Sequence, residues 1–226
     1  MHGNIMGNVN FDLARFNMVE QQIRTWEVFD HRVLDVLHAV PRELFVPTHL
    51  RNLAYADLSL PLDNGQTMMS PMLAAKMLQA LNIQHTDSVL EIGTGSGYST
   101  ALLARLCKEL RSVDCFPDML KLAAQHLKTL NITNATLEEA DVSSPQWNNE
   151  GPYDVIALTG SVPVLPERFK HNLRVGGRLF AVIGEEPLME AKLITRVGER
   201  EWVEEVLFET MLAPLLNIRK PVQFTF

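Results

Sequence analysis

The stretch VLEIGTGSGY from Val89 to Tyr98 constrains the fold of this chain more than any other part of its sequence. An apolar segment suited to a buried strand runs into three closely spaced glycines, and the apolar-periodic residues 101–104 follow them. Glycine permits positive φ and lacks the Cβ atom that would keep a ligand at a distance. Backbone N–H groups and the N-terminus of the next helix can therefore face a bound anion. The stretch predicts a strand–turn–helix unit that binds a cofactor.

Acidic residues beside this turn narrow the choice of cofactor. Glu91 stands just before Gly93, and Asp114 ends a second apolar segment about 20 residues further on, where the hydroxyls of a ribose need an acceptor. The spacing G-x-G-x-G differs from the dinucleotide fingerprint G-x-G-x-x-G, and a carboxylate at Glu91 would repel a pyrophosphate. S-adenosylmethionine, which has an ammonium group, a carboxylate and a ribose, is the predicted ligand. The alternatives are a glycine turn that serves packing alone and, more remotely, a nicotinamide-dependent reductase. The residues predicted to bind the cofactor here are Glu91, Gly93, Thr94, Gly95, Ser96, Gly97 and Asp114.

Hydrophobic periodicity along the chain predicts an α/β fold. Phe16, Val19, Ile23 and Trp26 recur at helical spacing, and residues 33–40 form a second apolar helical face. A short strand over 58–62 and a turn at 63–65 are expected to follow. Helices are then expected at 71–81, 99–106, 119–130 and 168–173, and strands at 89–92, 112–114, 135–138, 155–158 and 179–183, with a turn at 176–177. The alternation is typical of a parallel sheet covered by helices, closed by an antiparallel hairpin of residues 192–197 and 202–211. Residues 1–80 are interpreted as an N-terminal helical segment and acceptor-side loop, packed as one compact unit on a cofactor-binding domain of residues 81–226.

Charge and composition exclude several other classes of protein. The net charge is −7 and no cluster of Lys and Arg is present, so no nucleic-acid partner is expected. No apolar run reaches the roughly 20 residues of a membrane span, and no signal-peptide pattern begins the chain. Cys107 and Cys115 are interpreted as small apolar residues of a cytoplasmic protein. The histidines lack the spacing of metal ligands, so no metal site is expected. Nothing in the sequence assigns an oligomeric state.

Six patches of the sequence resemble, in order and spacing, the protein-L-isoaspartate O-methyltransferase family. They are MVEQQI (18–23), VPRELFVP (40–47), LAYAD (53–57), GQT (65–67), the glycine stretch (89–98) and LRVGGRL (173–179). The resemblance implies a class I methyltransferase fold, which is Rossmann-like with a seven-stranded sheet. It also implies S-adenosylmethionine as donor and the free carboxylate of isoaspartyl residues in damaged proteins as acceptor. By the same resemblance Asp141 contacts the adenine amino group, and Thr159 lies where ligands bind at the carboxyl edge of the sheet.

The resemblance breaks after the Gly-Gln-Thr patch. The family has a serine associated with the reaction two residues before a proline, where this chain has Met69, and Ser70 stands one residue late. Ser70 just before Pro71 is typical of a helix N-cap, which competes with a catalytic role. The candidate acceptor-side residues are therefore Thr67, Met69 and Ser70, with Gln66 beside them. A carboxylate acceptor is already ionised at neutral pH and needs no general base.

Three functional hypotheses remain open from the sequence. The first is repair methylation of isoaspartyl residues in proteins. The second is a methyltransferase of the same build with another carboxylate or a small molecule as acceptor, which Met69 favours because a thioether makes the acceptor pocket more apolar. The third is a protein that binds S-adenosylmethionine without catalysis.

Overall fold

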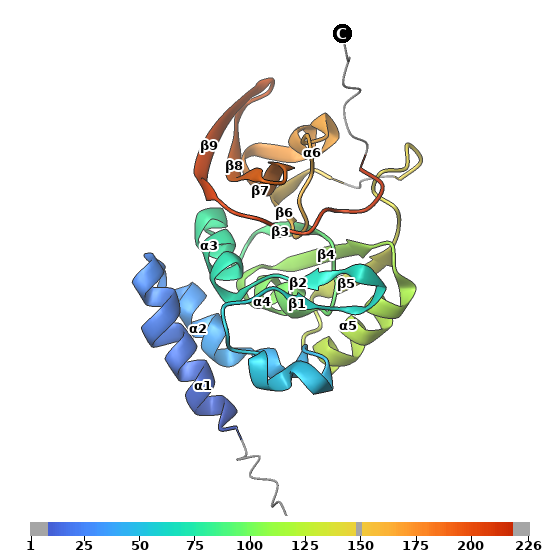
Figure 1. Ribbon diagram of the computed structural model, residues 1–226. Helices are drawn as coiled ribbons and strands as arrows, with labels where there is room; N and C mark the ends of the chain where they lie inside the picture. Colours follow the sequence, from blue (N-terminus) through green and yellow to red (C-terminus); the bar gives the residue numbers. More distant parts are fainter. Residues whose placement is uncertain (1–8, 148–150, 219–226) are drawn as a thin grey trace, which may run out of the picture.

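A seven-stranded sheet forms the centre of the computed structural model, which describes residues 9–147 and 151–218 (Figure 1). The strand order is β5-β4-β3-β6-β7-β8-β9. The first five strands in this order are mutually parallel, and β8 runs antiparallel to both of its neighbours, β7 and β9. The bounds are β3 (Ser88–Ile92), β4 (Glu109–Asp114), β5 (Ala135–Glu139), β6 (Tyr153–Leu158), β7 (Leu173–Glu185), β8 (Leu188–Gly198) and β9 (Glu201–Glu209). The predicted α/β class, with a mostly parallel sheet and a C-terminal antiparallel hairpin, is confirmed.

The sheet reverses its direction of growth at β3, and this positions the site. Chain connections lead from β3 to β4 on one side, and later to β6 on the other side of β3. In open α/β sheets such a reversal leaves a crevice outside the carboxyl ends of the two strands, where ligands bind. The predicted glycine turn follows β3 directly, so it lies at this crevice.

Helices cover both faces of the sheet because side chains alternate along each strand. Val89 of β3 packs in one hydrophobic cluster with residues of α3 (Pro71–Leu81), α4 (Tyr98–Leu106) and α5 (Pro117–Thr129). Leu90 packs in a second cluster with Phe169 of α6 (Glu167–His171). Two covered faces explain why all five residues of β3 are buried, as expected for a central parallel strand.

The N-terminal segment is helical, as predicted, but not as one regular helix. Its elements are α1 (Phe11–Asn17), the π-helix η1 (Met18–Ile23), the 3-10 helix η2 (Arg24–Trp26) and α2 (His31–Ala39). Val19 and Ile23 are buried, whereas Phe16 and Trp26 are about half exposed. The wider π turn breaks the 3.6-residue spacing on which the prediction rested, so the four residues do not share one face. The cluster containing Val19 also includes residues of α3, β3 and β6.

A small hairpin connects this segment to α3. After the 3-10 helices η3 (Arg42–Leu44) and η4 (Thr48–Leu53), β1 (Leu60–Pro61) pairs with β2 (Thr67–Met68) around the 3-10 turn η5 (Asp63–Gly65). The predicted turn is confirmed, with φ of +57° at Asn64 and +69° at Gly65. The predicted strand over 58–62 is reduced to its two residues in β1. Figure 1 shows this hairpin in front of β4 and β5.

Other predicted boundaries need correction around β7. The helix expected over 168–173 ends at His171, and Leu173 already begins β7. The glycine turn expected at 176–177 lies inside that strand: pairing with β6 shifts register there, and Gly176 has φ of +85°. The strand is therefore interrupted by an irregularity rather than ended by a turn. The last strand ends at Glu209, two residues before the predicted end.

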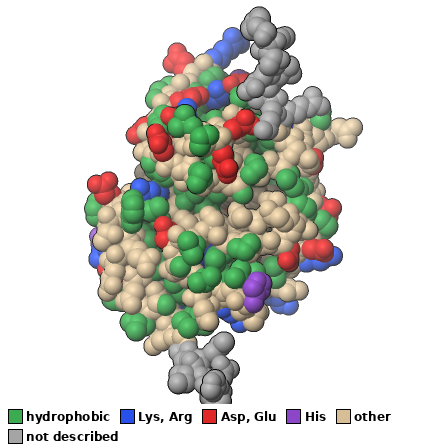
Figure 2. All heavy atoms as spheres, viewed as in Figure 1, with side chains coloured by type: hydrophobic (Ala, Val, Ile, Leu, Met, Phe, Trp, Pro, Cys, Tyr) green, Lys and Arg blue, Asp and Glu red, His purple; other side chains and the backbone are tan. Residues whose placement is uncertain are grey.

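Charged side chains of both signs occur on the molecular surface. On the face shown in Figure 2, Lys and Arg side chains lie apart near the outline, and acidic side chains lie among them.

Within residues 9–147 and 151–218, none of the helices combines the length and the hydrophobicity that crossing a membrane requires.

Candidate functional site: two cavities at the glycine turn

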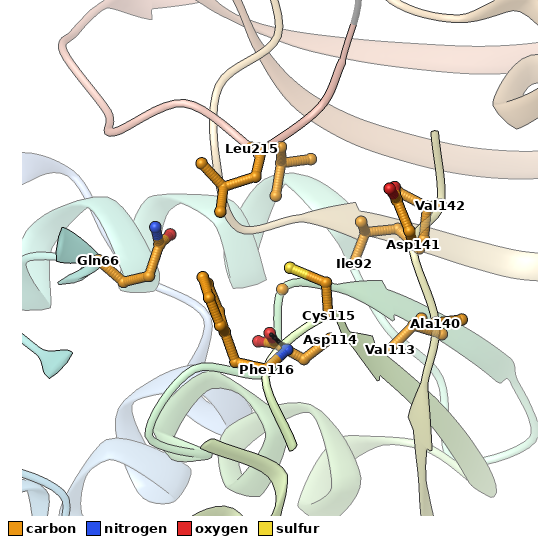
Figure 3. Close-up of a pocket in the computed structure, with 12 residues that line it drawn as sticks. Gln66, Ile92, Val113, Asp114, Cys115, Phe116, Ala140, Asp141, Val142 and Leu215 are labelled. Atoms are coloured by element: carbon orange, nitrogen blue, oxygen red, sulfur yellow. Dashed lines mark hydrogen bonds between the residues drawn. The ribbon is translucent and has the colours of Figure 1, made fainter. Parts of the chain in front are cut away.

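A cavity lies at the carboxyl ends of β3, β4 and β5 (Figure 3). This strand-end cavity is lined by Gln66, Ile92, Gly93, Val113, Asp114, Cys115, Phe116, Ala140, Asp141, Val142, Leu215 and Leu216. In Figure 3, Gln66 and Phe116 lie on one side, Asp141 and Val142 on the other, and Leu215 above. Two acidic residues predicted from separate strands, Asp114 and Asp141, are thus brought to one cavity. The carboxyl ends of adjacent parallel strands meet at the same sheet edge, which explains this convergence.

Both carboxylates of the strand-end cavity are held by hydrogen bonds. Asp114 accepts from the backbone N–H of Gly95 at 2.8 Å through Oδ2 and from that of Phe116 at 3.0 Å through Oδ1. Asp141 accepts from the Ser143 N–H at 2.8 Å and from the Asn217 side-chain amide at 2.9 Å. The hydrogen bonds from Ser143 lower the pKa of Asp141. Carboxylates held in this way suit the recognition of hydroxyl and amino donors.

The N–H groups of the three glycines in the turn already have partners within the protein. The three glycines have positive φ, and their N–H groups donate to protein acceptors: the carbonyl of Val113, the carboxylate of Asp114 and the carbonyl of Thr94, each within 2.9 Å. These three groups therefore do not face an anion. A Cβ at Gly93 would lie 2.4 Å from the Thr159 hydroxyl. The glycines allow the turn to fold tightly against the sheet, which keeps space at the cavity for a ligand.

Glu91 points into the protein interior. It is fully buried, and its Oε2 accepts hydrogen bonds of 2.6 Å from Thr100 and Ser112. Ser112 in turn shares a 2.6 Å hydrogen bond with Thr94 of the glycine turn. Burial raises the pKa of Glu91 to about 8, against the opposing effect of those two hydroxyls. Direct contact between Glu91 and a ligand ammonium group stays a prediction. In the structure, the contacts of Glu91 with Thr100 and Ser112 stabilise the turn from beneath.

A second cavity adjoins the first and shares Gly93 with it. This glycine-turn cavity is lined by Leu62, Thr67, Met68, Met69, Gly93, Thr94, Gly95, Ser96, Tyr98, Ser99 and Thr159. The acceptor-side candidates Thr67 and Met69 thus lie beside the turn, as does Thr159. The Thr159 hydroxyl donates to the carbonyls of Ile92 and Gly93, which ties β6 to the start of the turn.

Ser70 does not line the described part of this cavity, in contrast to Met69. Its side chain accepts a hydrogen bond of 3.4 Å from the N–H of Leu73, and Pro71 follows at the first position of α3. The N-cap interpretation of Ser70 is confirmed. A contribution of Ser70 to catalysis stays a prediction.

Several residues of the site were not found from the sequence. Cys115 and Phe116 directly follow Asp114, and burial raises the pKa of the Cys115 thiol. Leu215 comes from the segment after β9, which returns to the sheet edge through backbone hydrogen bonds of 2.9 Å between Ser161 and residues Ala213 and Leu215. Cys115 could have been predicted to line the cavity because it directly follows Asp114 in the sequence. Nothing in the hydrophobic periodicity of the sequence places Leu215 at this cavity. Among residues 9–147 and 151–218, no group of three or more His, Cys, Asp or Glu side chains is placed to hold a metal ion.

Comparison with known proteins identifies the family. The family model for protein-L-isoaspartate(D-aspartate) O-methyltransferase matches residues 14–220. A protein-L-isoaspartate O-methyltransferase of Methanoculleus marisnigri is 40% identical over 190 residues, which are 84% of this chain and 86% of that protein. Its counterpart from Magnetococcus marinus is 38% identical over 190 residues, 84% and 83% of the two chains.

Solved structures share the fold. A structure described as a protein-L-isoaspartate O-methyltransferase from Plasmodium falciparum, in complex with S-adenosyl-L-homocysteine, superposes with a TM-score of 0.77 at 20% identity. The match covers 92% of this chain and 99% of that one. With the family match over most of the sequence, the chain belongs to the protein-L-isoaspartate O-methyltransferase family.

Proposed function

We propose that this protein transfers the methyl group of S-adenosylmethionine to the free carboxylate of isoaspartyl residues in damaged proteins. The observation that carries this proposal is the family match over residues 14–220, combined with two cavities that meet at Gly93. Adjoining cavities allow a donor and an acceptor to be held together, which is the main requirement of a direct group transfer.

The strand-end cavity fits the adenosyl part of the donor. Asp114 would accept hydrogen bonds from the ribose hydroxyls, and Asp141 would accept one from the adenine amino group. Both carboxylates line the cavity, and each oxygen that already accepts one hydrogen bond has a further lone pair. Apolar side chains around them, Ile92 and Val142 among them, suit the faces of a flat ring.

The glycine-turn cavity fits the acceptor. When bound, S-adenosylmethionine supplies an electrophilic methyl carbon on a sulfonium sulfur. A carboxylate acceptor is ionised at neutral pH, so the protein has only to orient it and exclude water. Met68, Met69 and Tyr98 are buried side chains of this cavity and remove solvent from the carboxylate, and the Thr67 hydroxyl offers a hydrogen-bond donor.

Transfer of labelled methyl from S-adenosylmethionine to an isoaspartyl peptide tests the proposed function. The matched control is the same peptide with a normal aspartyl residue. We expect methyl ester on the isoaspartyl peptide alone. Equal labelling of both peptides, or none while calorimetry shows that the donor binds, would overturn the proposed acceptor.

A second candidate function is methylation of another carboxylate or of a small molecule. Met69 supports it because a buried thioether lines the acceptor cavity at the family's serine position, where it cannot donate a hydrogen bond. A missing positioning hydrogen bond costs about 1.5–3 kcal/mol, or roughly 10- to 100-fold in rate. If the isoaspartyl residue is the native acceptor, Met69→Ser should raise the rate on the isoaspartyl peptide by no more than that amount. A larger gain from a nearly inactive wild type would favour the second candidate.

Isoaspartyl-containing proteins or peptides are the proposed partners, and residues 1–80 and 81–226 are proposed to act as one compact unit. A cytoplasmic location is proposed from the cysteines, because Cys107 and Cys115 are free thiols at separate positions of the fold.

A further inference from the structure

The patch Val40–Pro47 resembles the family closely, yet Arg42 within it lines neither of the two cavities. Arg42 begins the 3-10 helix η3 and is fully buried. A fully buried arginine is rare, because a charge removed from water must be compensated by its surroundings. Burial lowers the pKa of Arg42 from its ordinary value. The cost of burying this side chain calls for a structural or functional reason.

The contacts of Arg42 are with two residues of the glycine-turn cavity. Its Nη2 donates a 2.7 Å hydrogen bond to the backbone carbonyl of Met69, 27 residues away in the sequence. Its guanidinium carbon lies 4.8 Å from the centre of the Tyr98 ring, in the range of a cation–π contact. Nε and Nη1 have no hydrogen-bond partner among the described residues. Arg42 therefore connects the acceptor-side loop with the first residue of α4.

Phe45 extends the connection to the other side of the glycine turn. Its ring centre lies 5.4 Å from that of Tyr98 and 4.9 Å from that of His126 on α5. His126 Nδ1 lies 2.8 Å from the carbonyl oxygen of Ser96. One short segment, residues 42–45, thus contacts both the acceptor-side loop and residues that hold the glycine turn.

Met69 lies between the other contacts that fix this loop. The pairing of β1 with β2 ends at Met68. The N-terminus of α3 is capped by Ser70 at the N–H of Leu73 and by Asp57, which accepts a 3.0 Å hydrogen bond from Met72. The hydrogen bond from Arg42 fixes the peptide group between these two regions.

We propose that Arg42 is a positioning residue, which fixes the backbone of Met69 relative to Tyr98 and so sets the distance between the acceptor and the donor. The proposal rests on the function proposed above, because the acceptor is taken to be the isoaspartyl carboxylate. Arg42 does not touch the reacting atoms, and its effect passes through the loop that lines the acceptor cavity.

Arg42→Met and Arg42→Lys test this role, with Arg178→Lys as the matched control. The methionine removes the charge and the donors but keeps the stem, while lysine keeps the charge without the planar group. Arg178 also donates to backbone carbonyls, those of Leu81 at 2.9 Å and Asn82 at 3.0 Å, at the opposite end of α3. The control therefore weakens an arginine–carbonyl contact at the far end of α3, away from both cavities.

Three readouts separate positioning from general stability. For Arg42→Met, kcat/KM for the isoaspartyl peptide should fall about 10- to 100-fold, as expected for a misplaced reactant. The Kd for S-adenosyl-L-homocysteine should stay within about threefold, because the Asp114 and Asp141 side of the site is untouched. Amide hydrogen exchange over residues 66–70 should become faster. Arg42→Lys should recover part of each change, and Arg178→Lys should show neither the kinetic loss nor the faster exchange.

Each unfavourable outcome has a definite meaning. Unchanged exchange over residues 66–70 in Arg42→Met, or a loss of donor affinity as large as the kinetic loss, would overturn the role of Arg42. A wild-type protein inactive on the isoaspartyl peptide would count against the proposed function, and the exchange experiment would still decide the anchoring of Met69. If Arg42→Met does not fold, Arg42→Lys provides the same three comparisons.

Discussion

Two carboxyl groups beside the glycine turn have opposite environments. Asp114 lines the strand-end cavity and accepts from two backbone N–H groups. Glu91 is fully buried beneath the turn, and burial raises its pKa to about 8. The first group is suited to binding a ligand, while the second supports Thr94 through Ser112. Neighbouring acidic residues thus take separate tasks because of their different access to solvent.

Glu91 should make stability depend on pH. Its pKa is about 8 in the folded protein against an ordinary value of 4.5, so the folded state keeps a proton that the unfolded chain releases between these values. The free energy of unfolding should therefore fall as pH rises from about 4.5 to about 8. Glu91→Gln should reduce that slope. Urea unfolding at several pH values measures it, and an equal slope in both proteins would contradict a protonated Glu91.

Asp114 should control donor affinity. Asp114→Ala removes the proposed acceptor of the ribose hydroxyls and also the carboxylate bonded to Gly95. We expect the Kd for S-adenosyl-L-homocysteine to rise at least about tenfold, since a hydrogen bond to a charged group contributes about 1.5–3 kcal/mol. Calorimetric titration measures it, with Asp118→Ala on the exposed start of α5 as control. Equal affinity in the two variants would remove Asp114 from the donor site.

Local sequence rules located some residues of the site but could not reveal others. Asp114 was predictable because it ends an apolar strand, and Asp141 because the family resemblance placed it after the next strand; parallel strands end at one edge of the sheet. Arg42 and Leu215 act through contacts with residues far away in the sequence, which periodicity does not encode. The orientation of Glu91 was equally hidden, because it depends on Thr100 and Ser112 of two other elements.

Among the secondary structure elements, the tight junction of β3, α4 and α5 depends on Gly97. Its φ is +87°, and a Cβ there would lie 2.9 Å from the Cβ of Ala123 on α5. Gly176 in β7 has a similar φ of +85° but no neighbouring atom within 4 Å of such a Cβ. The two glycines share a positive φ and differ in the atoms that an added Cβ would meet.

Alanine at these two glycines should therefore separate strain from packing. We expect Gly176→Ala to cost about 1–2 kcal/mol for the left-handed backbone, and Gly97→Ala to cost about 1–3 kcal/mol more from overpacking. Thermal and urea unfolding measure both. Equal losses in the free energy of unfolding would mean that overpacking of a Cβ at Gly97 against Ala123 does not destabilise the protein.

The start of α3 provides a second test on this scale. Ser70→Ala should lower the free energy of unfolding by about 1 kcal/mol, whereas Ser70→Asp should retain most of it, because aspartate is also a good N-cap. If Ser70 serves only as a cap, methyl transfer by Ser70→Asp should match the wild type once folding is complete. A large loss of kcat in Ser70→Asp with normal stability would instead support a catalytic role.

Element types were predicted better than element boundaries. The alternation of strands and helices followed from apolar periodicity, and the hairpin of β8 and β9 from its spacing. Glycine pairs mark turns in most sequences, so local rules predict a turn at Gly176 and Gly177; only the pairing with β6 extends β7 across them. The π turn of η1 left no sequence signal that distinguishes it from an α-helix.

On the scale of the whole molecule, the site is lined by residues that precede the seven-stranded sheet in the sequence and by residues that follow it. The N-terminal part supplies Gln66 and the acceptor-side loop, and the segment after β9 supplies Leu215 and Leu216. That segment is held by Ser161, whose hydroxyl donates to the Leu212 carbonyl at 2.8 Å, and by Asn217 at Asp141. Figure 1 shows it crossing near β3 and β6.

Donor binding should consequently protect this segment. We expect limited proteolysis within residues 211–218 to slow when S-adenosyl-L-homocysteine is added, because Leu215 and Leu216 line the cavity that the ligand fills. Ser161→Ala should accelerate cleavage of the free protein. Mass spectrometry of the fragments identifies the cleavage sites, and a rate that does not respond to the ligand would contradict a closing role.

The position of the transferred methyl group identifies the acceptor. One peptide carrying an isoaspartyl, a normal aspartyl and a glutamyl residue, incubated with the protein and S-adenosylmethionine, would be sequenced by tandem mass spectrometry. We expect a methyl ester on the α-carboxylate of the isoaspartyl residue and on no other carboxylate. An ester on another carboxylate, or no ester from a protein that binds the donor normally, would contradict the proposed function.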